Sequence, residues 1–424
     1  MPVGSTQPSF ISSLATLFTG TVLAQAIPFL AAPWIARLYD APQFTLFGAM
    51  LAVFNVLNVV VTGRYELAIV QPVDRKDAAD LLRGGLVLSV LMGIVLCIGL
   101  ETLHGPLESR FGLQRTGGVL IVLAMLAVFA GLQAFWQQWL LRARAFKSIA
   151  QVKVLQAVSI TGLALGMGAM GASGGLVLSY LFGWFLFALG SWLVVNRVAP
   201  VPGAWDRTRS VAMLRRYREF PLHNAWPALL NALASGAAVM YMSMFYAPQI
   251  AGEHNFARQY LLVPIGMISA ALGQVLFERT ASAVRDGRPV LADLRRVVLS
   301  LSAIALVGAL LMTAAGESMF AVLFGEAWRG AGKAATILVW GYGAQLVAGP
   351  LGMQLLAMGK VKAFMIFPLI FAAMLAVVPF FRDWDPMHFM ALLSAVEVVA
   401  YGAYAALVWY HVARYDRNLS TVRA

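Results

Sequence analysis

The most constraining feature of this sequence is a series of twelve apolar segments, most of them about twenty residues or longer, separated by short polar loops. A helix rises about 1.5 Å per residue, so about twenty apolar residues cross a hydrocarbon layer about 30 Å thick. Most segments lack the two-residue alternation of barrel strands, and helices satisfy their own backbone groups in lipid. The sequence therefore predicts an all-α integral membrane protein of about 12 transmembrane helices.

The expected spans form two sets of six. The first set covers residues 12–36, 42–62, 79–103, 117–140, 146–170 and 175–196, and the second covers residues 222–246, 257–277, 294–315, 334–357, 363–381 and 387–411. The longest loop, a basic linker near residues 197–221, separates an N-terminal six-helix lobe, 1–205, from a C-terminal one, 206–424. A short string that begins at Tyr39 after the first span recurs at Tyr246 after the seventh. This repeat favours two similar lobes facing a central cavity.

The basic residues predict the orientation of the chain. Of its 31 Lys and Arg, 24 follow even-numbered spans and 7 follow odd-numbered spans. Basic residues near helix ends stay in the cytoplasm, so both termini should face it, and the membrane should be the bacterial inner one. The same topology explains the net charge of +12, so the charge does not indicate a nucleic-acid partner, and we expect none. Arginines of the central loop can also contact anionic lipid heads.

Two further features limit processing and redox chemistry. Residues 1–11 hold no Lys or Arg, so we expect the first span to be kept rather than removed as a signal peptide. Cys97 is the only cysteine, which excludes an internal disulfide and a cysteine-based zinc site.

Polar residues inside the spans indicate which helix faces are wet, because polar side chains at membrane depth face protein or a water-filled cavity. At 100° per residue, three sets each fall on one helix face. They are Asn55, Asn58, Thr62 and Glu66 in span two, Gln133, Gln137 and Arg144 in span four, and Asn224, Asn231 and Ser235 in span seven. Hydrogen bonds between helices explain any one of these residues, whereas the three sets together favour a shared substrate cavity.

Charged residues near or within the spans have two interpretations each. Glu397, about ten residues into span twelve, is either an ion-coupling site or one member of a structural pair with an arginine. Arg37, Arg64, Arg258 and Glu278 lie near span ends, where long side chains can reach the interface instead of a substrate.

Signals for an enzyme are weak. Asp383, Trp384 and Asp385 form an Asp-x-Asp triplet whose two carboxylates could hold a metal and a sugar phosphate, but a turn before Pro386 is the favoured interpretation. The sequence has no metal-spaced histidine pair and no phosphate-binding glycine loop. We therefore expect no catalytic residues, no metal and no cofactor.

Five stretches carry a family resemblance: residues 19–38 (TGTVLAQAIPFLAAPWIARL), 64–70 (RYELAIV), 256–278 (FARQYLLVPIGMISAALGQVLFE), 324–332 (FGEAWRGAG) and 350–359 (PLGMQLLAMG). They resemble the polysaccharide repeat-unit flippases (the Wzx type) of the multidrug, oligosaccharidyl-lipid and polysaccharide exporter superfamily. The strings that begin at Arg64 and Phe324 are the most specific, and the likeness covers both halves.

This resemblance implies two lobes around a cationic cavity. The substrate would be an undecaprenyl-diphosphate-linked oligosaccharide, passed from the cytoplasmic to the outer leaflet for O-antigen, exopolysaccharide or capsule assembly. Arg64 and Glu66 fall on the family motif. Arg258 falls on the family's Ala-x-Arg or Ala-Arg string in span eight, which here reads Phe256, Ala257, Arg258 and is one residue shorter than the expected version. The implied partners are the lipid-linked oligosaccharide, membrane lipids and, as a candidate, a polysaccharide polymerase complex.

Two other functions stay open at this point. A cation-coupled drug or metabolite antiporter of the same superfamily would use a deep carboxylate such as Glu397 as its ion site. A polyprenol-linked glycosyltransferase or polymerase would need a large outer loop, and the outer loops here are short.

Overall fold

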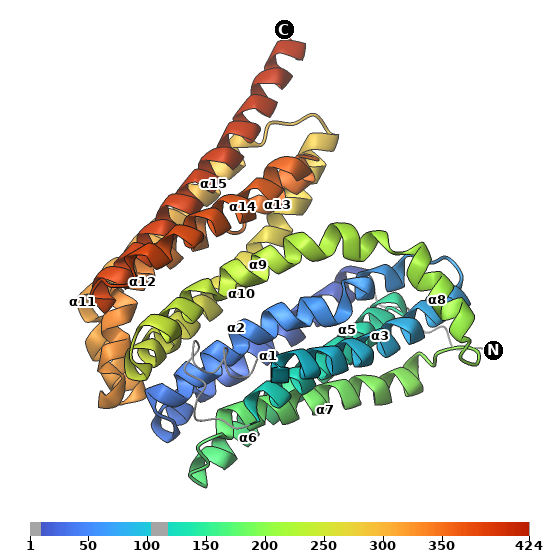
Figure 1. The fold of residues 1–424 in the computed structure, drawn as a ribbon. Helices are drawn as coiled ribbons and strands as arrows, with labels where there is room; N and C mark the ends of the chain where they lie inside the picture. The colour runs from blue at the N-terminus through green and yellow to red at the C-terminus, as the bar shows by residue number, and fades with distance from the viewer. Residues whose placement is uncertain (1–9, 103–117, 424) are drawn as a thin grey trace, which may run out of the picture. The chain divides into compact units, whose positions relative to one another are not determined.

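The computed structural model describes residues 10–102 and 118–423, and every regular element in these ranges is a helix (Figure 1). The first elements are α1 (Phe10–Leu38), α2 (Ala41–Thr62), the 3-10 helix η1 (Tyr65–Val70), α3 (Arg75–Thr102), α5 (Val119–Arg142), α6 (Phe146–Ala169), α7 (Gly175–Val198) and α8 (Arg207–Arg216). They are followed by α9 (Glu219–Phe245), α10 (Pro248–Arg285), α11 (Leu291–Phe324), η2 (Glu326–Trp328), α12 (Arg329–Ala348), α13 (Gly352–Ala357), α14 (Val361–Val377), η3 (Val378–Phe381) and α15 (Pro386–Arg423).

Twelve helical stretches among the described residues are long and apolar enough to cross a membrane, which confirms the all-α class and the number of spans. Three helices are much longer than predicted: α10 and α15 have 38 residues each, and α11 has 34. The prediction followed apolar runs, but backbone hydrogen bonding continues where a helix leaves the hydrocarbon. Pro248, which occupies the first turn of α10, begins that helix well before its apolar run.

The chain divides into two compact units. The first contains Met1–Tyr39 and Ala49–Ala232, and the second contains Asp40–Gly48 and Leu233–Ala424. In the first unit α6 packs against α1 and α7, α5 packs against α3 and α7, and α8 packs against α3. In the second unit α12 packs against α10, α11 and α15, and α14 packs against α15.

The first turns of α2 pack within the second unit. Asn255 Nδ2 in α10 donates a hydrogen bond to the carbonyl oxygen of Phe44 at 2.8 Å. The Phe44 ring meets Phe256 and Trp328 edge-on, with ring centroids 5.0 and 5.1 Å apart. Edge-to-face aromatic pairs add about 0.5 to 1.5 kcal/mol beyond the apolar area that they bury. This aromatic cluster fixes the α10 segment directly before Arg258.

The two tyrosines of the sequence repeat have equivalent roles in their own units. Tyr39 Oη, after the first span, donates to the carbonyl oxygen of Ala164 in α6, the fifth span, at 2.6 Å. Tyr246 Oη, after the seventh span, donates to the carbonyl oxygens of Arg382 and Trp384, directly after the eleventh span, at 3.3 and 3.0 Å. Each hydroxyl thus ties the first span of its half to the fifth.

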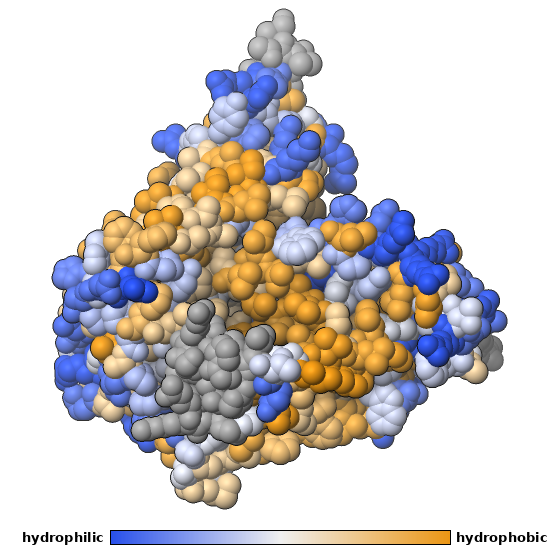
Figure 2. Space-filling model, in the orientation of Figure 1, coloured by the Kyte–Doolittle hydropathy of each residue, from blue (hydrophilic) through white to orange (hydrophobic). Residues whose placement is uncertain are grey.

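The surface carries the pattern expected of membrane helices. Figure 2 shows apolar side chains along the helices, whereas hydrophilic residues gather at helix ends, for example around α8 and near the end of α15. Exposed leucines, isoleucines and valines line α3 and α11, such as Leu91, Ile98, Leu310 and Leu311. In a soluble protein this exposure would be unfavourable, whereas in lipid it costs little.

Candidate functional site

Arg64 and Glu66 lie in a strained turn directly after α2. The helix ends because Gly63 and Arg64 both adopt left-handed backbone angles, with φ of 53° and 63°. The Arg64 backbone N–H donates to the Thr62 hydroxyl at 3.2 Å, which stabilises the turn. A left-handed conformation costs a non-glycine residue roughly 1–2 kcal/mol. Strain of this kind is kept where a side chain must point in a particular direction.

Within this turn Arg64 forms an ion pair with Glu66. Arg64 Nη1 lies 3.5 Å from Glu66 Oε1, and the two side chains are 32% and 8% exposed. Burial raises the pKa of the Glu66 carboxyl, while a hydrogen bond from its own backbone N–H, the Arg64 charge and the Thr62 hydroxyl offset part of the increase. The arginine is therefore held beside a carboxylate while it keeps access to solvent.

The prediction that Glu66 continues the polar face of α2 is wrong. The helix ends at Thr62, so only Asn55, Asn58 and Thr62 lie on its polar face. Asn55 is exposed, and Asn58 is half-buried with an Oδ1 that has no hydrogen-bond partner among the described residues. Glu66 approaches Thr62 through the turn instead of through the helix.

The prediction for span four is correct for its glutamines and wrong for its arginine. Gln133 Nε2 donates to Gln137 Oε1 at 2.8 Å, one turn apart on α5. The helix ends at Arg142, and Arg144 lies beyond it with φ 56°. The N–H groups of Arg144 and Ala145 close the end of the helix by donating to the carbonyl oxygens of Leu141 and Leu140 at 3.0 and 2.9 Å. Arg144 therefore does not share the helix face of the glutamines.

Three other predicted site residues lie at exposed positions of the first unit. Asn224 and Asn231 are exposed on α9, seven residues apart as the helical spacing requires. Arg37 is exposed in the last turn of α1, where its Nη1 donates to the Pro33 carbonyl oxygen at 3.0 Å. A cation at a helix C-terminus stabilises the exposed carbonyls, and this accounts for the position of Arg37.

In the second unit, the structure brings Arg258 and Glu397 together. Both line a cavity of about 60 Å³ whose walls also include Ser235, Tyr342, Gln345 and Tyr401. Arg258 Nη2 donates to the Ser235 carbonyl oxygen at 2.7 Å. Arg258 lies about three turns inside α10 and at the start of its apolar run, so its position near a span end agrees with the prediction, while its side chain lines this cavity.

Close packing of α12 and α15 fixes the position of Glu397. The Ser394 hydroxyl, one turn earlier on α15, accepts a hydrogen bond from Gly341 N at 3.0 Å and donates to the Ile337 carbonyl oxygen at 2.9 Å. A Cβ atom at Gly341 would overlap Glu397 Oε2 and would lie 3.0 Å from Glu397 Cβ, so a larger residue there would have to displace the Glu397 side chain. Glu397 Oε2 is buried without a hydrogen-bond partner among the described residues. A buried polar atom without a hydrogen-bond partner lowers the stability of the fold, so its presence calls for an explanation such as a role in function.

The sequence analysis missed His254, which lies one turn before Arg258 on the same helix. Its side chain is fully buried, and neither ring nitrogen has a hydrogen-bond partner in the described part of the chain. It also missed Tyr342 and Gln345, which come from α12. The sequence offered one signal for His254, its spacing of four residues from Arg258, because residues four apart lie on the same helix face.

The chain matches a known protein family over most of its length. The model of the family described as "Polysaccharide biosynthesis protein" matches residues 35–333, which include the predicted substrate-binding residues. The chain belongs to this polysaccharide biosynthesis protein family. No curated protein matches the chain at a significant level.

Solved structures show that this family member has the fold of the MOP transporter superfamily. A multidrug resistance MATE family transporter in an inward-facing conformation aligns with a TM-score of 0.68 and 13% identity, over 96% of this chain and 99% of its own. Lipid II flippase MurJ in an inward closed conformation aligns with a TM-score of 0.71 and 10% identity, over 97% and 91%. A MOP superfamily transporter from Pyrococcus furiosus aligns with a TM-score of 0.56 and 14% identity, over 96% of both chains.

Proposed function

We propose that this protein is a flippase that moves an undecaprenyl-diphosphate-linked oligosaccharide from the cytoplasmic to the outer leaflet of a bacterial inner membrane. It works by alternating access between two six-helix lobes, 1–205 and 206–424, and supplies surface polysaccharide assembly. Both termini lie in the cytoplasm, and the export route continues to a polysaccharide polymerase complex. The proposal is for transport and not for catalysis.

The observation that supports it is an arginine beside a buried carboxylate in each unit. Arg64 pairs with Glu66, and Arg258 shares its cavity with Glu397. A diphosphate needs cationic partners to leave water, and the planar fork of arginine matches two phosphate oxygens. In the empty carrier Glu66 pairs with the Arg64 guanidinium, and the incoming diphosphate takes its place. The polar groups of Gln133, Gln137, Asn55, Asn58, Asn224 and Asn231 are suited to sugar hydroxyls.

The experiment is a comparison of Lys and Gln variants at Arg64 and Arg258. Lys keeps the charge without the fork, and Gln removes the charge, so glycan export should decrease from wild type to Lys to Gln at constant protein abundance. The measurement is surface polysaccharide alongside the amount of protein in the membrane fraction. Normal export by both Gln variants would remove these arginines from the substrate site.

A cation-coupled antiporter of the same superfamily is a second candidate, favoured by the buried Glu397. It predicts that cells with Glu397→Gln accumulate a cationic dye while their surface polysaccharide is unchanged. The flippase predicts the reverse pattern for Arg64→Gln, so the two functions are separated by one pair of assays on two variants.

A further inference from the structure

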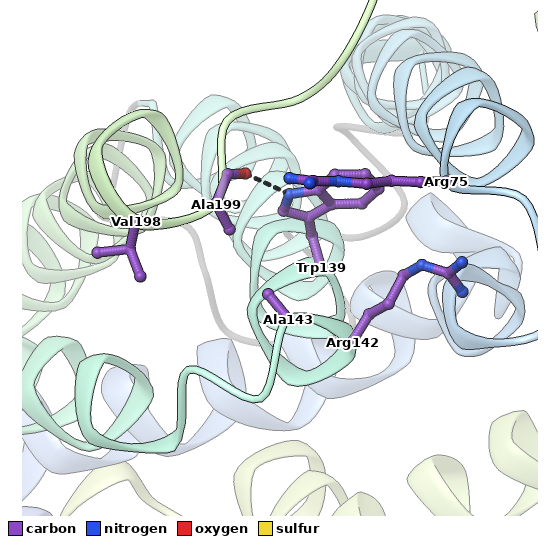
Figure 3. Close-up of a pocket in the computed structure, with 6 residues that line it drawn as sticks. All are labelled: Arg75, Trp139, Arg142, Ala143, Val198 and Ala199. Carbon is purple, nitrogen blue, oxygen red and sulfur yellow. Dashed lines mark hydrogen bonds between the residues drawn. The ribbon is translucent and has the colours of Figure 1, made fainter. Parts of the chain in front are cut away.

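A basic pocket of about 350 Å³ lies on the first unit, where α3 begins and where α5 and α7 end (Figure 3). Its lining consists of Arg75, Trp139, Arg142, Ala143, Val198 and Ala199. None of these residues was predicted to bind substrate. Two guanidinium groups around one pocket indicate an anionic ligand.

The first guanidinium is held in place before any ligand arrives. Arg75 lies across the indole of Trp139, 6.0 Å from the ring centroid, as Figure 3 shows. Its Nη2 donates to the Pro200 carbonyl oxygen at 3.0 Å. Trp139 is buried, and its Nε1 donates to the Ala199 carbonyl oxygen at 2.7 Å, so the platform under Arg75 is itself fixed. Ordering costs for binding an anion here are therefore small.

The second guanidinium connects the pocket to the turn that carries Arg64. Arg142 Nη1 donates to the carbonyl oxygens of Ile69 and Val70 at 3.4 and 3.3 Å, and its Nη2 donates to Val73 at 3.2 Å. Carbonyls satisfy N–H groups without neutralising charge. Among the described residues, no carboxylate lies within ion-pair distance of Arg75 or Arg142. The pocket therefore keeps about two positive charges.

The rim of the pocket favours a lipid over a soluble anion. Val198 lines it and is 57% exposed, and Val73, whose carbonyl oxygen Arg142 contacts, is fully exposed. Apolar side chains beside arginines at the ends of membrane helices fit a molecule with a charged head and an acyl chain. The excess of basic residues assigns this end of the helices to the cytoplasm, where the membrane leaflet carries anionic lipids.

We propose that the pocket of Arg75, Trp139 and Arg142 binds the phosphate head of an anionic phospholipid from the cytoplasmic leaflet. The phosphate binds in the pocket that the two guanidinium groups line, and the acyl chains run past Val198 and Val73. Because Arg142 also holds the carbonyls of Ile69, Val70 and Val73, the bound lipid stabilises the preceding turn that contains Arg64 and Glu66. This lipid site is separate from the transported substrate and does not depend on its identity.

The test is native mass spectrometry of the purified full-length protein with added phosphatidylglycerol or phosphatidylcholine. We expect wild type to retain phosphatidylglycerol preferentially. Arg75→Gln should weaken that retention by about tenfold, the effect of losing one charge-assisted contact. Lys76→Gln is the matched control, because Lys76 is the neighbour of Arg75 in the sequence and carries the same charge but does not line the pocket. That variant should bind like wild type.

Two further measurements distinguish a loss of lipid binding from a loss of folding. Arg75→Lys keeps the charge and should retain most of the binding, and near-ultraviolet circular dichroism compares the packing of all variants. Equal retention of both lipids by wild type, or equal losses in Arg75→Gln and Lys76→Gln, would overturn the proposal. Displacement of phosphatidylglycerol by millimolar inorganic phosphate would also overturn it, because the site would then recognise a soluble anion.

Discussion

Arg64 Nη1 lies 3.5 Å from Glu66 Oε1, across a turn in which Arg64 itself has a left-handed backbone. Two unfavourable features coincide here, because the arginine backbone is strained and the carboxylate is buried. Their pairing explains how each is tolerated, since the turn aims the guanidinium at the acid. A substitution of Arg64 therefore leaves a buried carboxylate without its partner, whereas a substitution of Glu66 removes that carboxylate.

Glu66→Gln should gain stability relative to wild type as the pH rises. Burial raises the folded-state pKa of Glu66 above its unfolded value, so its contribution to stability is complete below the unfolded pKa. It is lost as the pH rises through the folded pKa, whereas Gln does not titrate. The melting temperature of Glu66→Gln minus that of wild type, measured in detergent, should become more positive from about pH 4 to about pH 8.

A difference for Glu66→Gln that is flat over the same range would contradict the prediction.

Arg144→Gly should stabilise the protein by up to about 1 kcal/mol, because glycine adopts a left-handed backbone without strain. The ends of α6, α10 and α13 use the same pair of backbone hydrogen bonds and have glycine at this position, namely Gly171, Gly287 and Gly359. Arg144→Ala keeps the strain and removes the charge, so its melting temperature should not rise. An equal rise in the Ala variant would show that strain is not the source.

Gly341→Ala should destabilise the second unit by about 1 to 3 kcal/mol, because its new methyl group overlaps Glu397 Oε2 and lies only 3.1 Å from the Ser394 carbonyl oxygen. Gly343→Ala is the matched control on the same helix, where the added Cβ would make an ordinary 3.5 Å contact with Ala305. Melting temperature and membrane abundance of the two variants measure the difference. Adding Glu397→Ala to Gly341→Ala should restore part of the loss, and equal behaviour of the two glycines would contradict this packing.

The sequence was sufficient for features that depend on a single helix. Apolar runs predicted the twelve spans, and helical spacing predicted the contact between Gln133 and Gln137. It was insufficient where the helix stopped, because Arg64 and Arg144 occupy left-handed positions that usually hold glycine. Nothing in a helical projection marks such an arginine.

The sequence also could not predict contacts between distant helices. Arg258 lies on α10 and Glu397 on α15, and periodicity relates residues of one helix only. A structural pair between Glu397 and an arginine was one interpretation, but composition could not select which arginine. His254 was missed because a single histidine in an apolar helix resembles ordinary core.

A fusion reporter should confirm the orientation of the chain. Alkaline phosphatase fused after the C-terminus should be inactive, since the 24 of 31 basic residues that follow even-numbered spans predict a cytoplasmic C-terminus. A fusion truncated after Trp384, in the turn between η3 and α15, should be active and serves as the control. An active C-terminal fusion would reverse the topology.

Arg258 and Glu397 should be energetically coupled. Arg258→Gln leaves the buried Glu397 carboxylate without the guanidinium that shares its cavity, so this single variant should be the least stable. Glu397→Gln removes the charge that needs a partner, and the double variant should therefore be more stable than Arg258→Gln alone. The coupling energy from the four melting curves should be about 1 to 3 kcal/mol, the range for residues in one polar network.

Glycan export by the same four proteins separates a structural pair from a substrate site. If the pair only stabilises the second unit, the double variant should recover export together with abundance. If Arg258 also binds the diphosphate, abundance should recover while export stays low, because no substitution at Glu397 replaces the lost guanidinium. Additive stabilities would contradict the coupling, and full export by the double variant would contradict the role of Arg258 in the substrate site.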